Sequence, residues 1–117
     1  MKNEIIEEDN EEGISIFVEY FGSSPYVKVL DFLITGQAFD YSMTEIARGA
    51  KVGWSAFTRI WEQLLKKEIV VPTRNIGNAK LFKLNKKNPF VIKLIKFDWE
   101  LTKLETEKLD KKEIVIA

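Results

Sequence analysis

The apolar residues of this chain recur at intervals that predict helices in its first half and a hairpin after them. Between Ser24 and Gly36, apolar positions repeat every three or four residues, which predicts a helix. Ser24 suits the cap of this helix, Pro25 its first position and Gly36 a left-handed end. The preceding segment, 14–21, fits either a strand or one helical face, and we expect a short helix or an extended arm there.

Residues 42–65 have the pattern of two helices joined by a tight turn. Ser42 and Glu45 show the S-x-x-E spacing of a capping box, which predicts that a helix begins there. Residues 51–53 leave room only for a turn. A second helix is predicted over 54–67, where apolar residues recur at helical spacing: Phe57, Ile60, Trp61, Leu64 and Leu65. This order predicts a helix-turn-helix, whose second helix can enter the major groove of DNA.

A basic β-hairpin is predicted over residues 69–85. The run before Pro72 is rich in β-branched residues, and Pro72 lacks an N–H, so it belongs at a sheet edge. Gly and Asn residues within 75–78 supply turn chemistry, and 80–85 is the returning strand. We expect the short extended segment 39–41 to pair with this hairpin.

A last helix is predicted over 89–110, because Asn88 and Pro89 have the order of a cap and a first helical residue. Residues 111–117 are expected to form a tail. Five apolar residues of this helix fall at heptad spacing: Phe90, Leu94, Phe97, Leu101 and Leu104. This seam predicts either intramolecular core packing or a homodimer interface. We favour the homodimer, because so long an apolar helix exceeds what one small domain can cover.

Charge is distributed unevenly, although the formal net charge of the 117 residues is zero. Residues 1–12 hold one Lys and six acids, a net charge of −5, whereas residues 46–88 hold ten Lys or Arg and two acids, a net charge of +8. The local basic region favours a polyanionic partner. We therefore expect an acidic flexible tail over 1–13 and one DNA-binding domain over 14–88.

Two residue types that many catalytic and metal sites require are absent from the chain. The chain has no Cys and no His, which excludes disulfides and argues against a zinc centre or a His-based catalytic triad. We expect no metal, no cofactor and no enzymatic activity, since no nucleophile and base stand out. No apolar run is long enough to span a membrane, and the acidic N-terminus is unlike a signal peptide. The sequence therefore predicts a cytoplasmic protein.

Three phrases of the sequence carry a resemblance to a known group. They are FGSSP at 21–25, FDYS at 39–42, and PTR at 72–74 followed by IG at 76–77. With the order of elements over 22–105, they make the chain similar to the small winged helix-turn-helix transcription regulators common in archaea, of the MarR/ArsR-like type. The resemblance implies a mainly α fold with a small β-hairpin (α+β) and a long C-terminal helix. It also implies binding to double-stranded DNA and transcription regulation.

Candidate DNA contacts lie on the second motif helix, the turn before it and the hairpin. Arg59 can pair with guanine edges or phosphate, and the alternative is a surface ion pair with Glu62. Trp54 either fills a groove edge or packs as an aromatic lid. Lys51 occupies a turn position that requires positive φ, at a cost of about 1 kcal/mol for a residue with a Cβ. The full set of predicted DNA-binding residues is Lys51, Trp54, Ser55, Thr58, Arg59, Arg74, Asn75, Asn78 and Lys80.

The sequence thus predicts a homodimeric, sequence-specific DNA-binding regulator, and repression is favoured because no activation or ligand domain stands out. Two alternatives stay open. One is a winged helix used for protein contact inside a larger complex, which the apolar Trp54 favours. The other is a chromatin or plasmid protein with little sequence preference. The dependence of affinity on salt distinguishes protein contact from DNA binding, because contacts with phosphates weaken steeply as the salt concentration rises.

Overall fold

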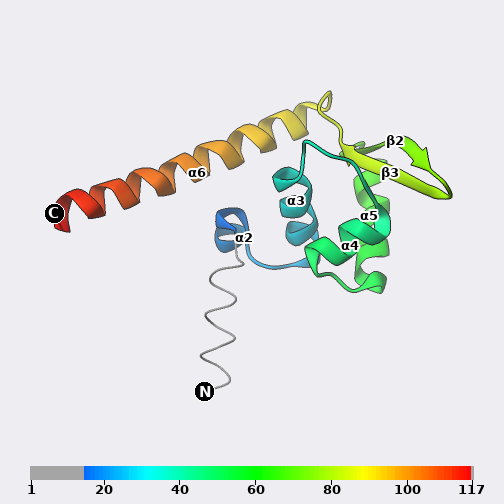
Figure 1. Ribbon diagram of the computed structural model, residues 1–117, viewed down its shortest axis with the longest axis horizontal. Coiled ribbons are helices and arrows are strands. Elements are labelled where there is room, and N and C mark those ends of the chain that lie inside the picture. Colours follow the sequence, from blue (N-terminus) through cyan, green and yellow to red (C-terminus); the bar gives the residue numbers. More distant parts are fainter. Residues whose placement is uncertain (1–14, 117) are drawn as a thin grey trace, which may run out of the picture.

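The computed structural model describes residues 15–116, with side chains up to residue 110, so the predicted tail at 1–13 lies outside the described residues. The chain forms α2 (Ile16–Phe21), α3 (Pro25–Thr35), β1 (Tyr41–Ser42), α4 (Met43–Ala50), α5 (Trp54–Lys66), β2 (Val70–Ile76), β3 (Ala79–Leu84) and α6 (Pro89–Ile116). Helices α3 to α5 group beside the hairpin, and α6 runs away from it (Figure 1). The predicted mainly α fold with a small hairpin and a long last helix is confirmed.

The hydrophobic core joins α3, α4, α5, the sheet and the start of α6. Its fully buried side chains come from every one of these elements: Val29, Leu33, Ile46, Phe57, Leu64, Val70, Leu84 and Val91. Complete burial of one such side chain contributes about 1.5–3 kcal/mol relative to exposure. This shared core fixes α5 against α3 on one side and against the sheet on the other.

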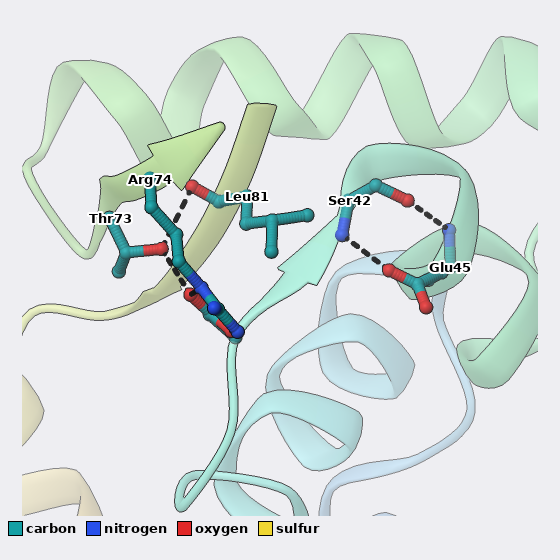
Figure 2. A network of polar contacts seen from close by, with 6 residues as sticks. Ser42, Glu45, Thr73, Arg74 and Leu81 are labelled. Carbon is teal, nitrogen blue, oxygen red and sulfur yellow. Dashed lines mark hydrogen bonds and ion pairs between the residues drawn. The ribbon is translucent and has the colours of Figure 1, made fainter. Parts of the chain in front are cut away.

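The helix starts follow the cap residues that the sequence predicts. Ser24 caps α3, and the Ser42 Oγ accepts a hydrogen bond from the Glu45 N–H at 3.2 Å. In return, the Ser42 N–H donates to Glu45 Oε1 at 2.8 Å, which completes the capping box of α4 (Figure 2). Asn88 Oδ1 accepts from the Phe90 N–H at 2.8 Å at the start of α6. These local contacts set where three of the helices begin.

Three expectations need correction or completion. Gly36 is not left-handed, since its φ is −99°. A Cβ there would lie 2.2 Å from the Tyr41 hydroxyl oxygen, so lack of space explains the glycine. The segment 14–21 contains the helix α2, capped by Ser15, and not an extended arm. The last helix does not end before residue 111, because no Gly or Pro interrupts it and it continues to Ile116.

The three strands form an antiparallel sheet in the order β1-β3-β2. Tyr41 pairs with Phe82, which confirms that a short strand before the helix-turn-helix joins the hairpin. Pro72 lies on the edge strand β2, as its missing N–H predicts. Gly77 adopts φ +59° at the tight turn between β2 and β3. The hairpin therefore projects from the core as a wing, defined here as residues 70–84.

Helix α2 packs against the middle of α6. The rings of Phe21 and Phe97 lie 5.8 Å apart, and the Tyr20 hydroxyl donates a hydrogen bond to the Glu105 carboxylate. Lys108 Nζ donates to the Tyr20 hydroxyl at 3.4 Å and lies 3.8 Å from Glu105 Oε1. The hydrogen bond with Tyr20 and then the charge of Glu105 raise the pKa of Lys108. Within the described residues, no helix combines the length and hydrophobicity needed to cross a membrane.

Candidate nucleic-acid interface

The turn between α4 and α5 positions the second motif helix. Lys51 has φ 60° and ψ 46°, so the left-handed turn predicted at this residue is confirmed. Its carbonyl accepts a hydrogen bond from Lys28 Nζ at 2.9 Å, which ties the turn to α3. Gly53 is the N-cap of α5 and offers no side-chain cap. Backbone conformation and the contact with α3 thus fix where α5 begins.

Helix α5 has a buried face and an exposed face. Phe57, Trp61 and Leu64 are buried in the core. The candidate contact residues Ser55 and Arg59 lie on the exposed face, one helical turn apart. Thr58, another candidate, is half-buried, and its hydroxyl donates to the Ser55 carbonyl at 3.1 Å. Thr58 is therefore less available for a ligand than the other candidates on this helix.

Arg59 is exposed and does not form the surface ion pair considered as its alternative role. Among the described side chains, the ion pairs within 4.0 Å are Arg74 with Asp40 and Lys108 with Glu105. The Arg59 guanidinium is thus presented to solvent on the outer face of α5, where it can donate hydrogen bonds to a polyanion.

Trp54 combines exposure with a fixed orientation. The residue is 52% exposed, yet its ring stacks on Phe57 with centroids 5.5 Å apart and an interplanar angle of 25°. Phe57 stacks in turn on Trp61 at 5.1 Å, and Trp61 meets Phe82 of the wing edge-on at 5.1 Å. This aromatic row runs from the first turn of α5 into the core. Trp54 therefore presents half of its surface at the N-terminal end of α5 without being a closed lid.

The wing presents Asn75, Asn78 and Lys80 to solvent, but Arg74 is engaged within the chain. Arg74 Nε lies 3.0 Å from Asp40 Oδ2, and Arg74 Nη2 lies 3.2 Å from Asp40 Oδ1. The Thr73 hydroxyl donates to Asp40 Oδ2 at 2.5 Å. Figure 2 shows the Thr73 and Arg74 side chains converging beside Leu81.

Asp40, which the sequence did not single out, is the partner of both Thr73 and Arg74. Its side chain is only 15% exposed. Hydrogen bonds from Arg74 and then Thr73 lower the pKa of its carboxyl from 3.8 to about 2. One signal in the sequence could have indicated this ion pair. Asp40 is acidic and lies in the extended segment that was expected to pair with the hairpin, and the hairpin carries Arg74. A bidentate pair with a carboxylate is the contact that a phosphate would otherwise make with this guanidinium.

The heptad seam of α6 is divided between the interior and the surface. Leu101 is 8% exposed and Leu94 is half-buried, so both pack within their own chain. Phe90, Phe97 and Leu104 are about half exposed. Outside the seam, α6 exposes further large apolar side chains at Ile92, Trp99 and Leu109.

A helix-turn-helix followed by a basic wing and a long last helix is the arrangement of the winged-helix fold. No protein-family model and no curated protein matches this sequence. Among solved structures, it resembles Staphylococcus aureus MepR, a transcription regulator of the multidrug efflux pump MepA. The TM-score is 0.56 at 12% identity, over 92% of this chain and 79% of that one.

A second likeness is to Lactococcus lactis ZitR, a zinc-responsive MarR family member, with a TM-score of 0.53 and 23% identity over 73% of this chain. This chain covers 60% of the ZitR chain. The structure of ZitR in complex with DNA matches with a TM-score of 0.51 and 21% identity, over 76% of this chain and 66% of that one. At these identities, the likenesses establish the shared fold.

Proposed function

We propose that this chain is a sequence-specific regulator that binds double-stranded DNA, with α5 in the major groove and the wing on the flanking backbone. The observation that carries the proposal is the exposed face of α5, where Ser55 and Arg59 are open to solvent, as is Lys51 of the preceding turn. Arg59 donates to guanine O6 and N7 or to phosphate, and such contacts supply sequence reading or affinity respectively. The fold shared with ZitR, whose structure includes a complex with DNA, supports binding to DNA.

The wing supplies contacts that position the protein on the duplex. Lys80 and the tip residues Asn75 and Asn78 are exposed and suited to phosphate or the minor groove. Further exposed lysines at 83, 86 and 87 give this part of the chain the same sign of charge as α5. Arg74 has fewer free donors than the sequence suggests, because its Nε and Nη2 already face Asp40, although its side chain is 63% exposed.

We further propose a homodimer through α6. The half-exposed seam residues Phe97 and Leu104 and the neighbouring exposed Trp99 provide apolar surface for a second copy. A two-fold dimer places two α5 helices about one helical turn of DNA apart and so recognises a palindrome. Repression follows if the bound dimer blocks polymerase. The cytoplasmic location expected from the sequence accompanies this proposal.

A second candidate function is contact with a protein partner. It is favoured by the exposed apolar side chains Trp54 at the start of α5 and Ile76 at the wing tip, which are 52% and 56% exposed. Apolar contact with a protein is insensitive to salt, whereas DNA binding through several phosphates weakens as salt rises.

The test is equilibrium binding of a fluorescent random-sequence duplex at about 50 and 200 mM salt, a range over which several phosphate contacts change affinity by orders of magnitude. We expect binding at low salt and a steep loss at high salt. A lack of binding at low salt contradicts the DNA proposal and directs attention to the protein-contact candidate. Salt-sensitive binding without sequence preference supports an architectural protein in place of a specific regulator.

A further inference from the structure

Asp40 connects the wing to the helix-turn-helix through one short segment. It lies two residues before Ser42, the N-cap of α4. Its carboxylate accepts hydrogen bonds from Thr73 and Arg74 of β2. Because the strand order is β1-β3-β2, these contacts reach across β3 to the edge strand. The segment 40–42 therefore holds the wing at one end and begins the first motif helix at the other (Figure 2).

The contacts of Asp40 fall where the backbone pairing of the wing is irregular. Pro72 pairs with Phe82, and the next pair is Asn75 with Lys80, so two residues of β2 oppose the single residue Leu81. Such a bulge bends its strand and increases the local twist. The two residues of the bulge are Thr73 and Arg74, the partners of Asp40, and the wing tip follows directly after them. Side-chain contacts thus hold β2 at the point where the backbone ladder is interrupted.

We propose that Asp40 is a positioning residue for DNA binding. Its carboxylate fixes the bulge at Thr73 and Arg74, so that the wing tip and α5 meet the same duplex. This inference rests on the proposed function. The competing explanation is that Asp40 only neutralises Arg74 and thereby weakens attraction to a polyanion. The two explanations predict opposite signs for the same substitution.

Asp40→Asn separates them. The substitution raises the formal net charge from zero to +1, so electrostatics alone strengthens binding to duplex DNA. Loss of positioning has the opposite effect, and we expect binding about tenfold weaker, equivalent to about 1.4 kcal/mol. The slope of log affinity against log salt should also fall by about 1 for each phosphate contact that the wing loses.

Two further variants and hydrogen exchange in the free protein serve as controls for Asp40→Asn. Thr73→Val removes one hydrogen bond to Asp40 without changing charge, and a smaller loss in the same direction is expected. Asp110→Asn adds the same charge at an exposed position of the last turns of α6, a helix that runs away from the wing (Figure 1), and should leave duplex binding unchanged or slightly tighter. In the free protein, amide hydrogen exchange over 75–80 should accelerate in Asp40→Asn, while the amides of α5 keep their protection.

The possible outcomes distinguish failure of the positioning role of Asp40 from failure of the proposed DNA binding. If the wild type binds the random-sequence duplex and Asp40→Asn binds it equally well or more tightly, the positioning role is overturned and the proposed function stands. If the wild type does not bind at low salt, both are overturned. If Asp40→Asn does not fold, Thr73→Val decides by the same two readouts, and unchanged affinity with unchanged wing exchange overturns the positioning role.

Discussion

The indole ring of Trp54 stacks on the ring of Phe57, with centroids 5.5 Å apart and an interplanar angle of 25°. Phe57 is fully buried, so Trp54, although half exposed, stacks on a ring that belongs to the core. An exposed aromatic side chain normally samples several rotamers, and fixing it in advance removes part of the entropic cost of binding. The stack therefore prepares an apolar contact surface at the start of α5.

Trp54→Ala should weaken duplex binding by about 1 kcal/mol, roughly fivefold. The slope of affinity against salt should stay unchanged, because the indole carries no charge and releases no counterions. Trp54→Phe, which keeps a ring against Phe57, should retain most of the affinity. Titrations over a range of salt concentrations measure both quantities, and a reduced slope in Trp54→Ala would show that the change disturbs the phosphate contacts as well.

Arg59→Ala should weaken binding to a preferred duplex by about 1–3 kcal/mol, the value of a good side-chain contact with a base. Its effect on the free energy of unfolding should stay within about 0.5 kcal/mol, because Arg59 is an exposed surface residue. Arg48→Ala is the matched control, since it removes the same charge from an exposed position on α4. Equal losses for the two variants would mean that only net charge matters and would contradict a specific role for Arg59.

Lys51→Gly should raise the free energy of unfolding by about 1 kcal/mol, because glycine adopts the left-handed conformation without steric cost. The carbonyl of residue 51 still accepts the hydrogen bond from Lys28 in this variant. Lys51→Ala keeps a Cβ and should show no such gain. Chemical denaturation of the three proteins checks the prediction, and it fails if the glycine variant is no more stable than the alanine variant.

Two leucines of α6 should respond differently because one is exposed and the other is buried. Leu104→Asp places an unpaired carboxylate on the half-exposed seam and should shift the proposed dimer to monomer in sedimentation experiments. Leu101→Ala should instead lower the free energy of unfolding by about 2–5 kcal/mol, as expected for a buried leucine. A wild-type protein that sediments as a monomer at every concentration would contradict the dimer.

The ion pair of Asp40 should persist in acid. Its carboxyl pKa is about 2 in the folded protein, below the ordinary 3.8, so its stabilising effect is complete above pH 4 and is lost as pH falls through about 2. An NMR titration of the side-chain carboxyl carbon should give this midpoint, and Arg74→Gln should move it towards 3.8. A wild-type midpoint already near 3.8 would show that the pair is not formed in solution.

Local signals in the sequence predicted where α3, α4, α5 and α6 begin. The spacing of Ser42 and Glu45 predicted the start of α4, and the cap-and-proline pairs predicted α3 and α6. The left-handed Lys51 followed from the resemblance to helix-turn-helix motifs, in which this turn position has positive φ. Each of these features depends on residues within a few positions of one another, where backbone hydrogen bonding and sterics decide the outcome.

The pairing of the segment before the helix-turn-helix with the hairpin was predicted, but individual side-chain contacts between distant residues were not. Asp40 and Arg74 meet only because β1 and β2 flank β3 and because the bulge at Thr73 turns the strand. The role of Gly36 depends on the Tyr41 ring, which folds back over it. Likewise, heptad spacing could not distinguish the buried Leu101 from the exposed Leu104, because the position of α2 decides which part of α6 is covered.

Recognition of duplex DNA by two copies of α5 is tested most directly by selection from a random duplex pool at low and moderate salt. We predict enrichment of a palindrome whose half-sites lie about 10 base pairs apart, centre to centre. The enrichment should be lost in Arg59→Ala and retained in Arg48→Ala. Failure of the wild-type protein to retain any duplex at low salt would contradict the account.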